Sequence, residues 1–159
     1  ASRFWAVIIG IDDYKEIKSL DCCVANAESF QEYLVADLGV RIQLLLESKE
    51  YDSPGNPKYL SRTHIIDALL SLIDNHEIEK GDNTIIYYAG HSSSYKCSDY
   101  EMPDAKFSPG NIGYIEALCP IDRDTHGKAV PDISDRTLNT VLTLISRAKG
   151  HHITVILDC

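Results

Sequence analysis

Four short apolar runs, each about the length of a β-strand, recur along the chain. They are Phe4–Ile11, Arg41–Leu46, Asn83–Tyr88 and His151–Leu157. Runs of this kind are typical of strands that are buried on both faces of a parallel sheet. All are far shorter than the ~20 residues that span a bilayer, so we expect no membrane partner.

The segments between these runs carry apolar residues at helical spacing, with capping residues before them or glycines after them. They are Ala27–Leu38 before Gly39, Ile65–Ile73 after Ser61 and Thr63, and Leu138–Ile145 between Ser134-Asp135 and Gly150. Strands that alternate with helices of this length form βαβ units. The predicted class is therefore α/β, with a mostly parallel sheet flanked by helices.

Two stretches interrupt this alternation. Glu47–Tyr59 is rich in Ser, Pro, Gly and Asn and reads as a surface loop. Ser92–Asp132 contains the alternating segment Gly113–Leu118 and is too long for an idle connection in a compact domain. Because it follows the carboxyl end of a predicted strand, where parallel sheets build their sites, we expect it to help form a functional site.

Size and charge exclude several classes of protein. The chain has 159 residues, which is enough for one domain, and a net charge of −9 with no basic stripe, so nucleic acid is not an expected partner. The five cysteines are odd in number and irregularly spaced. They indicate a reducing compartment, and with no export signal before the first strand we expect a cytoplasmic protein.

His91 and Cys159 are the residues most able to carry chemistry. Each follows a predicted strand, and the carboxyl ends of parallel strands share one edge of the sheet. A thiol beside an imidazole is the minimum for covalent acyl transfer. On spacing alone, however, a hydrogen-bonded structural histidine and a buried thiol explain the same residues.

Local motifs decide between these interpretations. Tyr87–Ser93 (YYAGHSS) resembles the Y-(S/A)-G-H-G histidine motif of the caspase-like cysteine peptidases, above all the metacaspases and their fungal relatives. Val155–Cys159 (VILDC) resembles the opening of their D-(S/C)-C-H-S-G nucleophile motif. Phe4–Asp13, Leu20–Ala27 and Glu116–Asp122 are similar to the first strand, the L-x-G-C-x-N-D-A helix opening and the hairpin of that family. The mammalian caspase signature Q-A-C-x-G is absent.

The resemblance implies a caspase-hemoglobinase fold and a Cys–His dyad with His91 as its histidine. The family nucleophile follows Asp-Ser or Asp-Cys, so it matches the residue after Cys159; Cys159 itself is the alternative. The chain, 1–159, is thus expected to be a large-subunit-like part of a domain, cut at the nucleophile motif and inactive by itself. A small-subunit-like remainder would complete it. Ser92, whose amide would serve the oxyanion, stands where the family has glycine.

The resemblance also suggests a substrate pocket. In metacaspases two aspartates receive Arg or Lys before the scissile bond. Asp158 matches one of them, Asn26 stands in place of the other, and Cys23 matches a wall of the pocket. Leu20 occupies the position of the arginine with which classical caspases hold Asp, so cleavage after Asp is not expected.

Many metacaspases bind calcium. The resemblance does not extend to that calcium site, because the matching hairpin positions of this chain hold Ile115 and Glu116. We therefore predict no metal and no cofactor, and a polypeptide as the substrate.

Three functions remain open at this stage. The first is a cysteine endopeptidase that cleaves after basic residues. The second is a caspase-like domain that no longer cleaves and acts as a scaffold or regulator. The third is a receiver-like module suggested by Asp12-Asp13, but it would need an aspartate where His91 stands, so these carboxylates are expected to be simply solvated.

Overall fold

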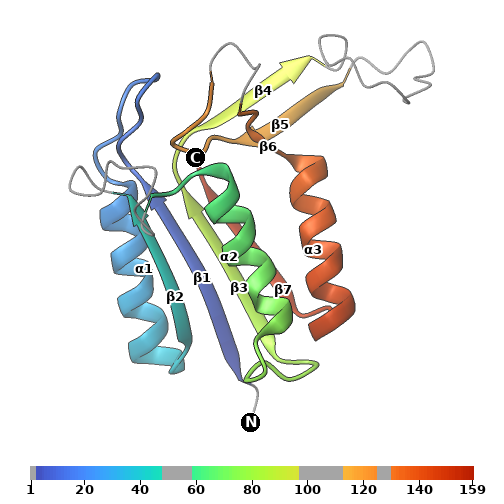
Figure 1. Ribbon diagram of the computed structural model, residues 1–159. Helices are drawn as coiled ribbons and strands as arrows, with labels where there is room; N and C mark the ends of the chain where they lie inside the picture. The colour runs from blue at the N-terminus through green and yellow to red at the C-terminus, as the bar shows by residue number, and fades with distance from the viewer. Residues whose placement is uncertain (1–2, 48–58, 97–112, 125–129) are drawn as a thin grey trace, which may run out of the picture.

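A four-stranded parallel sheet forms the centre of the protein (Figure 1). The computed structural model describes residues 3–47, 59–96, 113–124 and 130–159. The strands of this sheet are β1 (Phe4–Ile11), β2 (Arg41–Glu47), β3 (Asn83–Ala89) and β7 (Ile153–Asp158). Their order is β2-β1-β3-β7, and every neighbouring pair is parallel. The predicted α/β class and its four strands are confirmed.

Helices cover both faces of this sheet (Figure 1). They are α1 (Cys23–Leu38), α2 (Arg62–Asp74) and α3 (Asp135–Lys149). Alternate residues of β1 point to opposite faces, as the pleat of a strand requires. Val7 and Ile9 pack with residues of α2 and α3, whereas Ala6 and Ile8 pack with residues of α1. The continuous apolar runs in the sequence are explained by this burial on both sides.

Gly10 allows α1 to approach β1 closely. A Cβ at this position would lie 2.8 Å from Ala27 Cβ and 2.9 Å from the Cys23 carbonyl oxygen, and neither neighbour has room to move. A side chain here would therefore push the first turn of α1 away from the sheet.

The predicted helix ends agree with the structure, with one correction at α1. Ser61 and Ser134 cap α2 and α3, and Gly39 and Gly150 end α1 and α3. Asp12, however, is not simply solvated. Its carboxylate accepts hydrogen bonds from the backbone amides of Cys23, at 2.8 Å, and Val24, at 3.3 Å. The expectation failed because this cap comes from a residue eleven positions upstream of the helix, where no local capping pattern exists.

A small antiparallel sheet lies beyond the carboxyl edge of the parallel one (Figure 1). Its strands are β4 (Ser92–Lys96), β5 (Tyr114–Leu118) and β6 (Ile133–Ser134). The alternating segment corresponds to β5, whereas β4 was missed because its sequence, SSSYK, has no apolar alternation. Residues 48–58 of the first predicted loop, and residues 97–112 and 125–129 of the second, lie outside the described residues.

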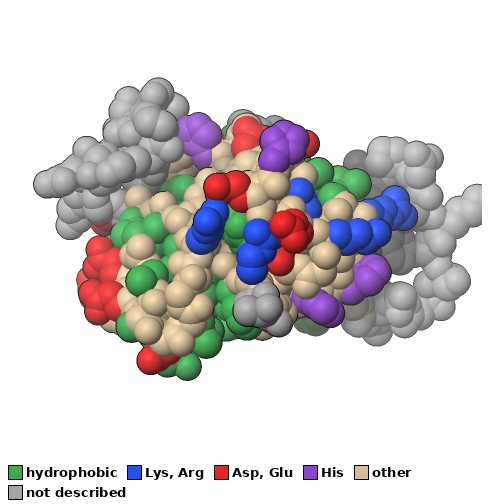
Figure 2. Space-filling view, turned by 90° about the horizontal axis from the view of Figure 1, so that it is seen from below, with side chains coloured by type: hydrophobic (Ala, Val, Ile, Leu, Met, Phe, Trp, Pro, Cys, Tyr) green, Lys and Arg blue, Asp and Glu red, His purple; other side chains and the backbone are tan. Residues whose placement is uncertain are grey.

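The opposite edge of the parallel sheet carries charges of both signs (Figure 2). Arg3 pairs with Asp82 at 2.8 Å, and Arg41 pairs with Glu77 at the same distance. The charged side chains at this edge are therefore mixed in sign and partly paired. Within the described ranges, the structure contains no helix with the length and apolar character that crossing a membrane requires.

Candidate active site

The register of β3 and β7 brings His91 and Cys159 to the same edge of the parallel sheet. Ala89 of β3 is paired with Asp158 of β7, and the Gly90 amide donates to the Asp158 carbonyl oxygen at 3.4 Å. His91 follows Gly90 and Cys159 follows Asp158, so a histidine and an exposed cysteine stand at the ends of two adjacent strands, at one edge of the sheet. Their catalytic roles stay predictions.

The imidazole of His91 is oriented by a backbone carbonyl. Its Nε2 lies 2.7 Å from the carbonyl oxygen of Lys18. Because a carbonyl only accepts hydrogen bonds, Nε2 must carry the hydrogen, and the neutral ring then has Nδ1 as its acceptor. This contact was not foreseen, since any residue type supplies a carbonyl and the sequence therefore holds no signal for it.

The loop that presents Lys18 is closed at its base by Asp12. The Leu20 amide donates to the Asp12 carbonyl oxygen at 2.8 Å, while the Asp12 carboxylate caps α1. The carbonyl that faces His91 is thereby tied to both β1 and α1.

Ser92 is the first residue of β4 and shows no backbone strain. Among the described residues only glycines have a positive φ, so a serine in place of the family glycine needs no unusual conformation. The Cys119 amide donates to the His91 carbonyl oxygen at 3.0 Å, which makes Ser92 and Leu118 a non-hydrogen-bonded pair of the ladder. The Ser92 amide therefore lies on the outer edge of β4, away from β5.

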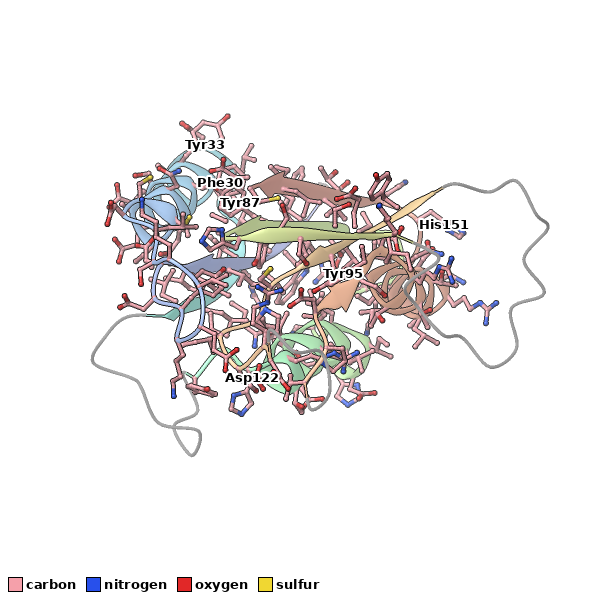
Figure 3. The ribbon with its side chains drawn as sticks, turned by 90° about the horizontal axis from the view of Figure 1, so that it is seen from above. Phe30, Tyr33, Tyr87, Tyr95, Asp122 and His151 are labelled. Carbon is pink, nitrogen blue, oxygen red and sulfur yellow. The ribbon has the colours of Figure 1, made fainter. Side chains whose placement is uncertain are left out.

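Asp158 and Asn26, both predicted to bind substrate, are in contact. The Asp158 carboxylate accepts from Asn26 Nδ2 at 3.1 Å and from the Tyr87 hydroxyl at 2.9 Å, both on Oδ2. The Tyr87 ring stacks on Phe30 of α1 at 4.6 Å between centroids, and Figure 3 shows the two side by side. Burial, and then the bond to Asp158, raise the pKa of Tyr87, so its hydroxyl stays a donor to the carboxylate.

Cys23 lies in the first turn of α1 and is buried. Burial, with nearby Asp12 and then Asp158 among the further causes, raises the pKa of its thiol to about 11. A thiol of this kind stays protonated near neutral pH and is not a nucleophile, while the predicted place of Cys23 in a pocket wall stays a prediction.

An apolar hollow of about 230 Å³ adjoins Cys159. Leu118, Leu138 and Leu157 are among its apolar lining residues, and Ser92 also lines it. The predicted nucleophile motif is thus next to a surface that can receive an apolar side chain.

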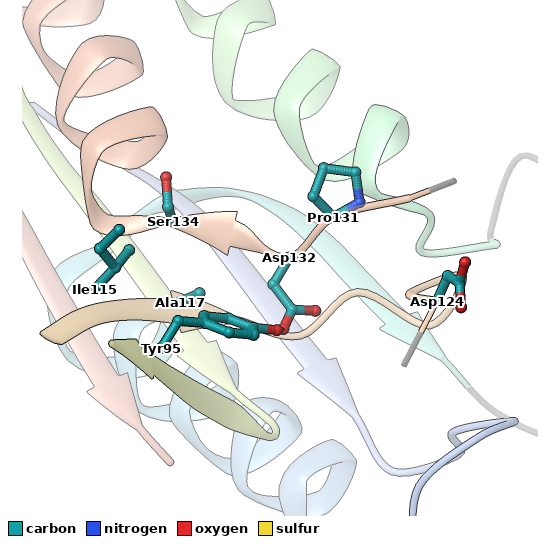
Figure 4. Close-up of a pocket in the computed structure, with 7 residues that line it drawn as sticks. All are labelled: Tyr95, Ile115, Ala117, Asp124, Pro131, Asp132 and Ser134. Atoms are coloured by element: carbon teal, nitrogen blue, oxygen red, sulfur yellow. The ribbon is translucent and has the colours of Figure 1, made fainter. Parts of the chain in front are cut away.

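A second pocket, of about 90 Å³, lies beside the antiparallel sheet and is not lined by His91 (Figure 4). Its Asp132 is neutralised by Arg123, whose Nε and Nη2 each donate to the carboxylate at 2.8 Å. Tyr95 and Ser93 donate to the same carboxylate. Since every one of these groups has a partner, the cluster serves to hold the sheet together.

No group of three or more His, Cys, Asp or Glu side chains in the described part of the chain is placed to hold a metal ion. At the positions matched to calcium binding, Ile115 is buried and Glu116 accepts from Ser94 Oγ at 3.0 Å. The prediction that no metal is used stays a prediction.

The fold and the residues at the carboxyl edge of the parallel sheet together define a class of protein. A parallel sheet whose adjacent strands end in a histidine and a cysteine, with helices on both faces, has the architecture of the caspase-like peptidases. The chain belongs to the metacaspase, peptidase C14 domain family, whose model matches residues 5–159. The resemblance drawn from the sequence motifs is confirmed.

Individual relatives support the family and the fold. The chain is 29% identical over 146 residues to Metacaspase-3 of Arabidopsis thaliana, a match that covers 92% of this chain and 37% of that protein. It is also similar to the crystal structure of protein GSU0716 from Geobacter sulfurreducens, with a TM-score of 0.63 and 19% identity. That match covers 98% of this chain and 48% of the other. The chain thus spans little more than a third of the curated relative.

Proposed function

We propose that the protein to which this chain belongs is a cysteine endopeptidase in which His91 is the general base and acid. The observation that carries this proposal is the hydrogen bond from His91 Nε2 to Lys18, which leaves Nδ1 as the acceptor at the edge where β7 ends in Asp158-Cys159. Family membership supports the same chemistry.

The proposed reaction proceeds in two steps that share one imidazole. His91 Nδ1 takes the thiol proton, the thiolate attacks the peptide carbonyl carbon, and the oxyanion accepts from backbone amides such as that of Ser92. The C–N bond breaks as Nδ1 returns the proton to the leaving amine. Water then loses a proton to Nδ1 and attacks the thioester, which releases the acid and the free thiol.

The nucleophile is assigned by motif to the cysteine expected after Cys159, with Cys159 as the alternative. Replacing each in turn by alanine in the full-length protein distinguishes the two. Only the true nucleophile is required for burst-phase acyl-enzyme formation.

We propose a preference for Arg or Lys before the scissile bond. Asp158 is exposed, and both of its hydrogen bonds within the described residues fall on Oδ2, so Oδ1 remains for a cationic side chain. Since Asn26 supplies an amide where the family has a second carboxylate, the preference is expected to be weaker than with two charges.

The decisive experiment measures kcat/KM of the full-length protein on matched peptides that carry Arg, Lys, Asp or Ala before the scissile bond. His91→Ala should lower kcat/KM by roughly 10³-fold or more, because both proton transfers are lost. His151→Ala, at an exposed histidine bonded to Ser146, is the control and should leave it unchanged.

Retained turnover in His91→Ala would overturn the assignment. A wild-type protein that cleaves none of the peptides, yet folds, would instead favour the alternative of a caspase-like scaffold or regulator. Asp158→Asn should abolish the advantage of Arg and Lys over Ala without abolishing cleavage.

No cofactor takes part in the proposed steps, which use side chains and amides of the chain. We expect peptidase activity to survive dialysis against a calcium chelator. A loss of activity that calcium restores would contradict this.

We propose further that the remainder of the same domain, the small-subunit-like part, packs along β7. This strand ends the order of the parallel sheet in the described structure, and its Ile156 and Leu157 are 36% and 49% exposed. An open strand edge with apolar side chains is a surface that proteins cover.

A further inference from the structure

We propose that Tyr14 and Tyr88 are positioning residues that hold the backbone of His91 in place through a closed circuit of hydrogen bonds. The inference rests on the proposed peptidase function. It concerns two tyrosines that do not touch the reacting atoms.

Both polar groups of the His91 backbone are bound by these tyrosines. The His91 amide donates to the Tyr14 hydroxyl at 2.8 Å. The Tyr88 hydroxyl lies 2.9 Å from the His91 carbonyl oxygen and 3.0 Å from that of Cys119. The two hydroxyls are 3.3 Å apart, the longest link of the circuit.

The donors and acceptors fix a direction around the circuit. Carbonyl oxygens cannot donate, so the single hydroxyl hydrogen of Tyr88 is directed to them. The hydrogen between the hydroxyls must then come from Tyr14, whose oxygen is free to accept from the His91 amide. The sequence of donors is therefore His91 N–H, Tyr14 O–H, Tyr88 O–H and back to the His91 carbonyl.

The circuit is buried and keeps its hydrogens. Tyr14 is 7% exposed and Tyr88 is 1% exposed. Burial raises the pKa of both hydroxyls well above their ordinary value, so both remain protonated donors near neutral pH. In such surroundings a lost hydrogen bond leaves a polar group unsatisfied, which gives the circuit its rigidity.

The circuit joins three segments that are far apart in the chain. Tyr14 lies after β1, Tyr88 is the penultimate residue of β3, and Cys119 follows β5 of the antiparallel sheet. His91 is the point where the two sheets meet, and its neighbour Ser92 begins β4. The circuit therefore places the imidazole and the proposed oxyanion amide together.

Tyr14 also contacts the imidazole itself. The two rings meet edge to face with centroids 4.9 Å apart. With the Lys18 carbonyl on Nε2, this contact limits the ring to one orientation. A shift of the backbone would move Nδ1 relative to the thiol, and small misplacements of this kind cost roughly 10- to 100-fold in rate.

The test replaces each hydroxyl by hydrogen in the full-length protein. Tyr14→Phe and Tyr88→Phe should each lower kcat by roughly 10-fold or more, with KM unchanged, because substrate binding does not involve them. The double variant should lose little more than either single one, since both break the same circuit. Tyr33→Phe is the control: it removes the hydroxyl of a tyrosine on α1 that is 55% exposed, and it should leave kcat unchanged.

Wild-type kcat in both variants would overturn the inference. An equal loss in Tyr33→Phe would also overturn it, because it would indicate an effect that does not depend on the circuit. Nitrogen NMR of the His91 imidazole gives a readout that does not need turnover. The wild-type ring should be held in the Nε2–H tautomer, and both variants should show a mixture.

This readout separates the inference from the proposed function. If the wild-type protein folds but cleaves no peptide, the proposed function fails. The NMR measurement of the His91 tautomer then tests the inference by itself. If both variants keep the single tautomer of the wild type, the positioning role of the two tyrosines is overturned.

Discussion

Gly90, directly before His91, shows how narrow the tolerance is around the candidate histidine. A Cβ there would lie 2.6 Å from the Tyr14 hydroxyl oxygen and 2.7 Å from that of Tyr88. Because both rings are buried, neither can swing away freely. Packing against the two tyrosines therefore explains why the histidine motif has a glycine at this position. The explanation does not depend on a backbone conformation that only glycine adopts.

Gly90→Ala is therefore expected to be destabilising and to disturb the circuit. Overpacking of a filled interior costs about 1–3 kcal/mol, which urea denaturation would measure. Combining it with Tyr14→Phe, which removes the nearest atom, should recover part of that loss. A double variant as unstable as the sum of the two single ones would contradict this explanation.

The buried thiols of Cys23 and Cys119 should make stability depend on alkaline pH. Burial raises the pKa of both to about 11 from an ordinary value of 9.0. The unfolded chain releases these protons near pH 9 while the folded chain keeps them, so the contribution of the two thiols to stability should be fully present below that pH and be lost as the pH rises toward 11.

Urea midpoints measured between about pH 8 and pH 10 would show this slope. The Cys23→Ala and Cys119→Ala variants should flatten it, whereas Cys22→Ala, which removes an exposed thiol, should not. An identical slope in all variants would show that other groups cause it.

Among the elements, the antiparallel sheet depends on one buried ion pair. Strand β6 is only two residues long, and the side chains of Arg123 and Asp132 beside it are 13% and 2% exposed. The bidentate pair fixes the turn after β5 against β6, and β4 joins through Ser93 and Tyr95. The strand that starts at Ser92 is thereby held in register.

Arg123→Met is expected to cost about 3–5 kcal/mol of folding free energy, because it leaves the Asp132 carboxylate buried without its cation. Arg41→Met is the matched control. It removes the exposed pair with Glu77, whose side chains are 63% and 65% exposed, and should cost at most about 1 kcal/mol. Denaturation measures the free energy of folding that each variant loses. Equal losses in the two variants would show that the burial of the ion pair does not set its contribution to stability.

At the scale of the whole molecule, the open edge of β7 is the surface along which we propose that the remainder of the domain packs. Ile156 lies opposite Tyr87, which packs with residues of α1, yet Ile156 is 36% exposed. If the remainder of the domain packs there, Ile156→Asp should destabilise the full-length protein by about 2 kcal/mol or more, because a carboxylate would become buried. The measurement is the urea midpoint of the full-length protein.

Leu144→Asp is the control for this change. Leu144 lies on α3 and is 43% exposed, so its apolar exposure is comparable to that of Ile156. It should have little effect. A small effect of both substitutions would show that the β7 surface stays open in the full-length protein.

The sequence by itself determined the elements and the family. Continuous apolar runs predict buried parallel strands, and a capping serine before helical spacing predicts the starts of α2 and α3, because these signals depend only on neighbouring residues. The motifs around His91 and Asp158 placed both residues at strand ends, and the parallel register then brought them to one edge.

Only the tertiary structure decided how that edge is held. The Lys18 carbonyl on His91, the Tyr14 hydroxyl on the His91 amide and the Asp12 cap on α1 each join residues that are distant in the chain. Strand β4, polar throughout, forms because β5 offers it a partner. Such contacts depend on where the folded chain returns in space, and local sequence patterns carry no record of that.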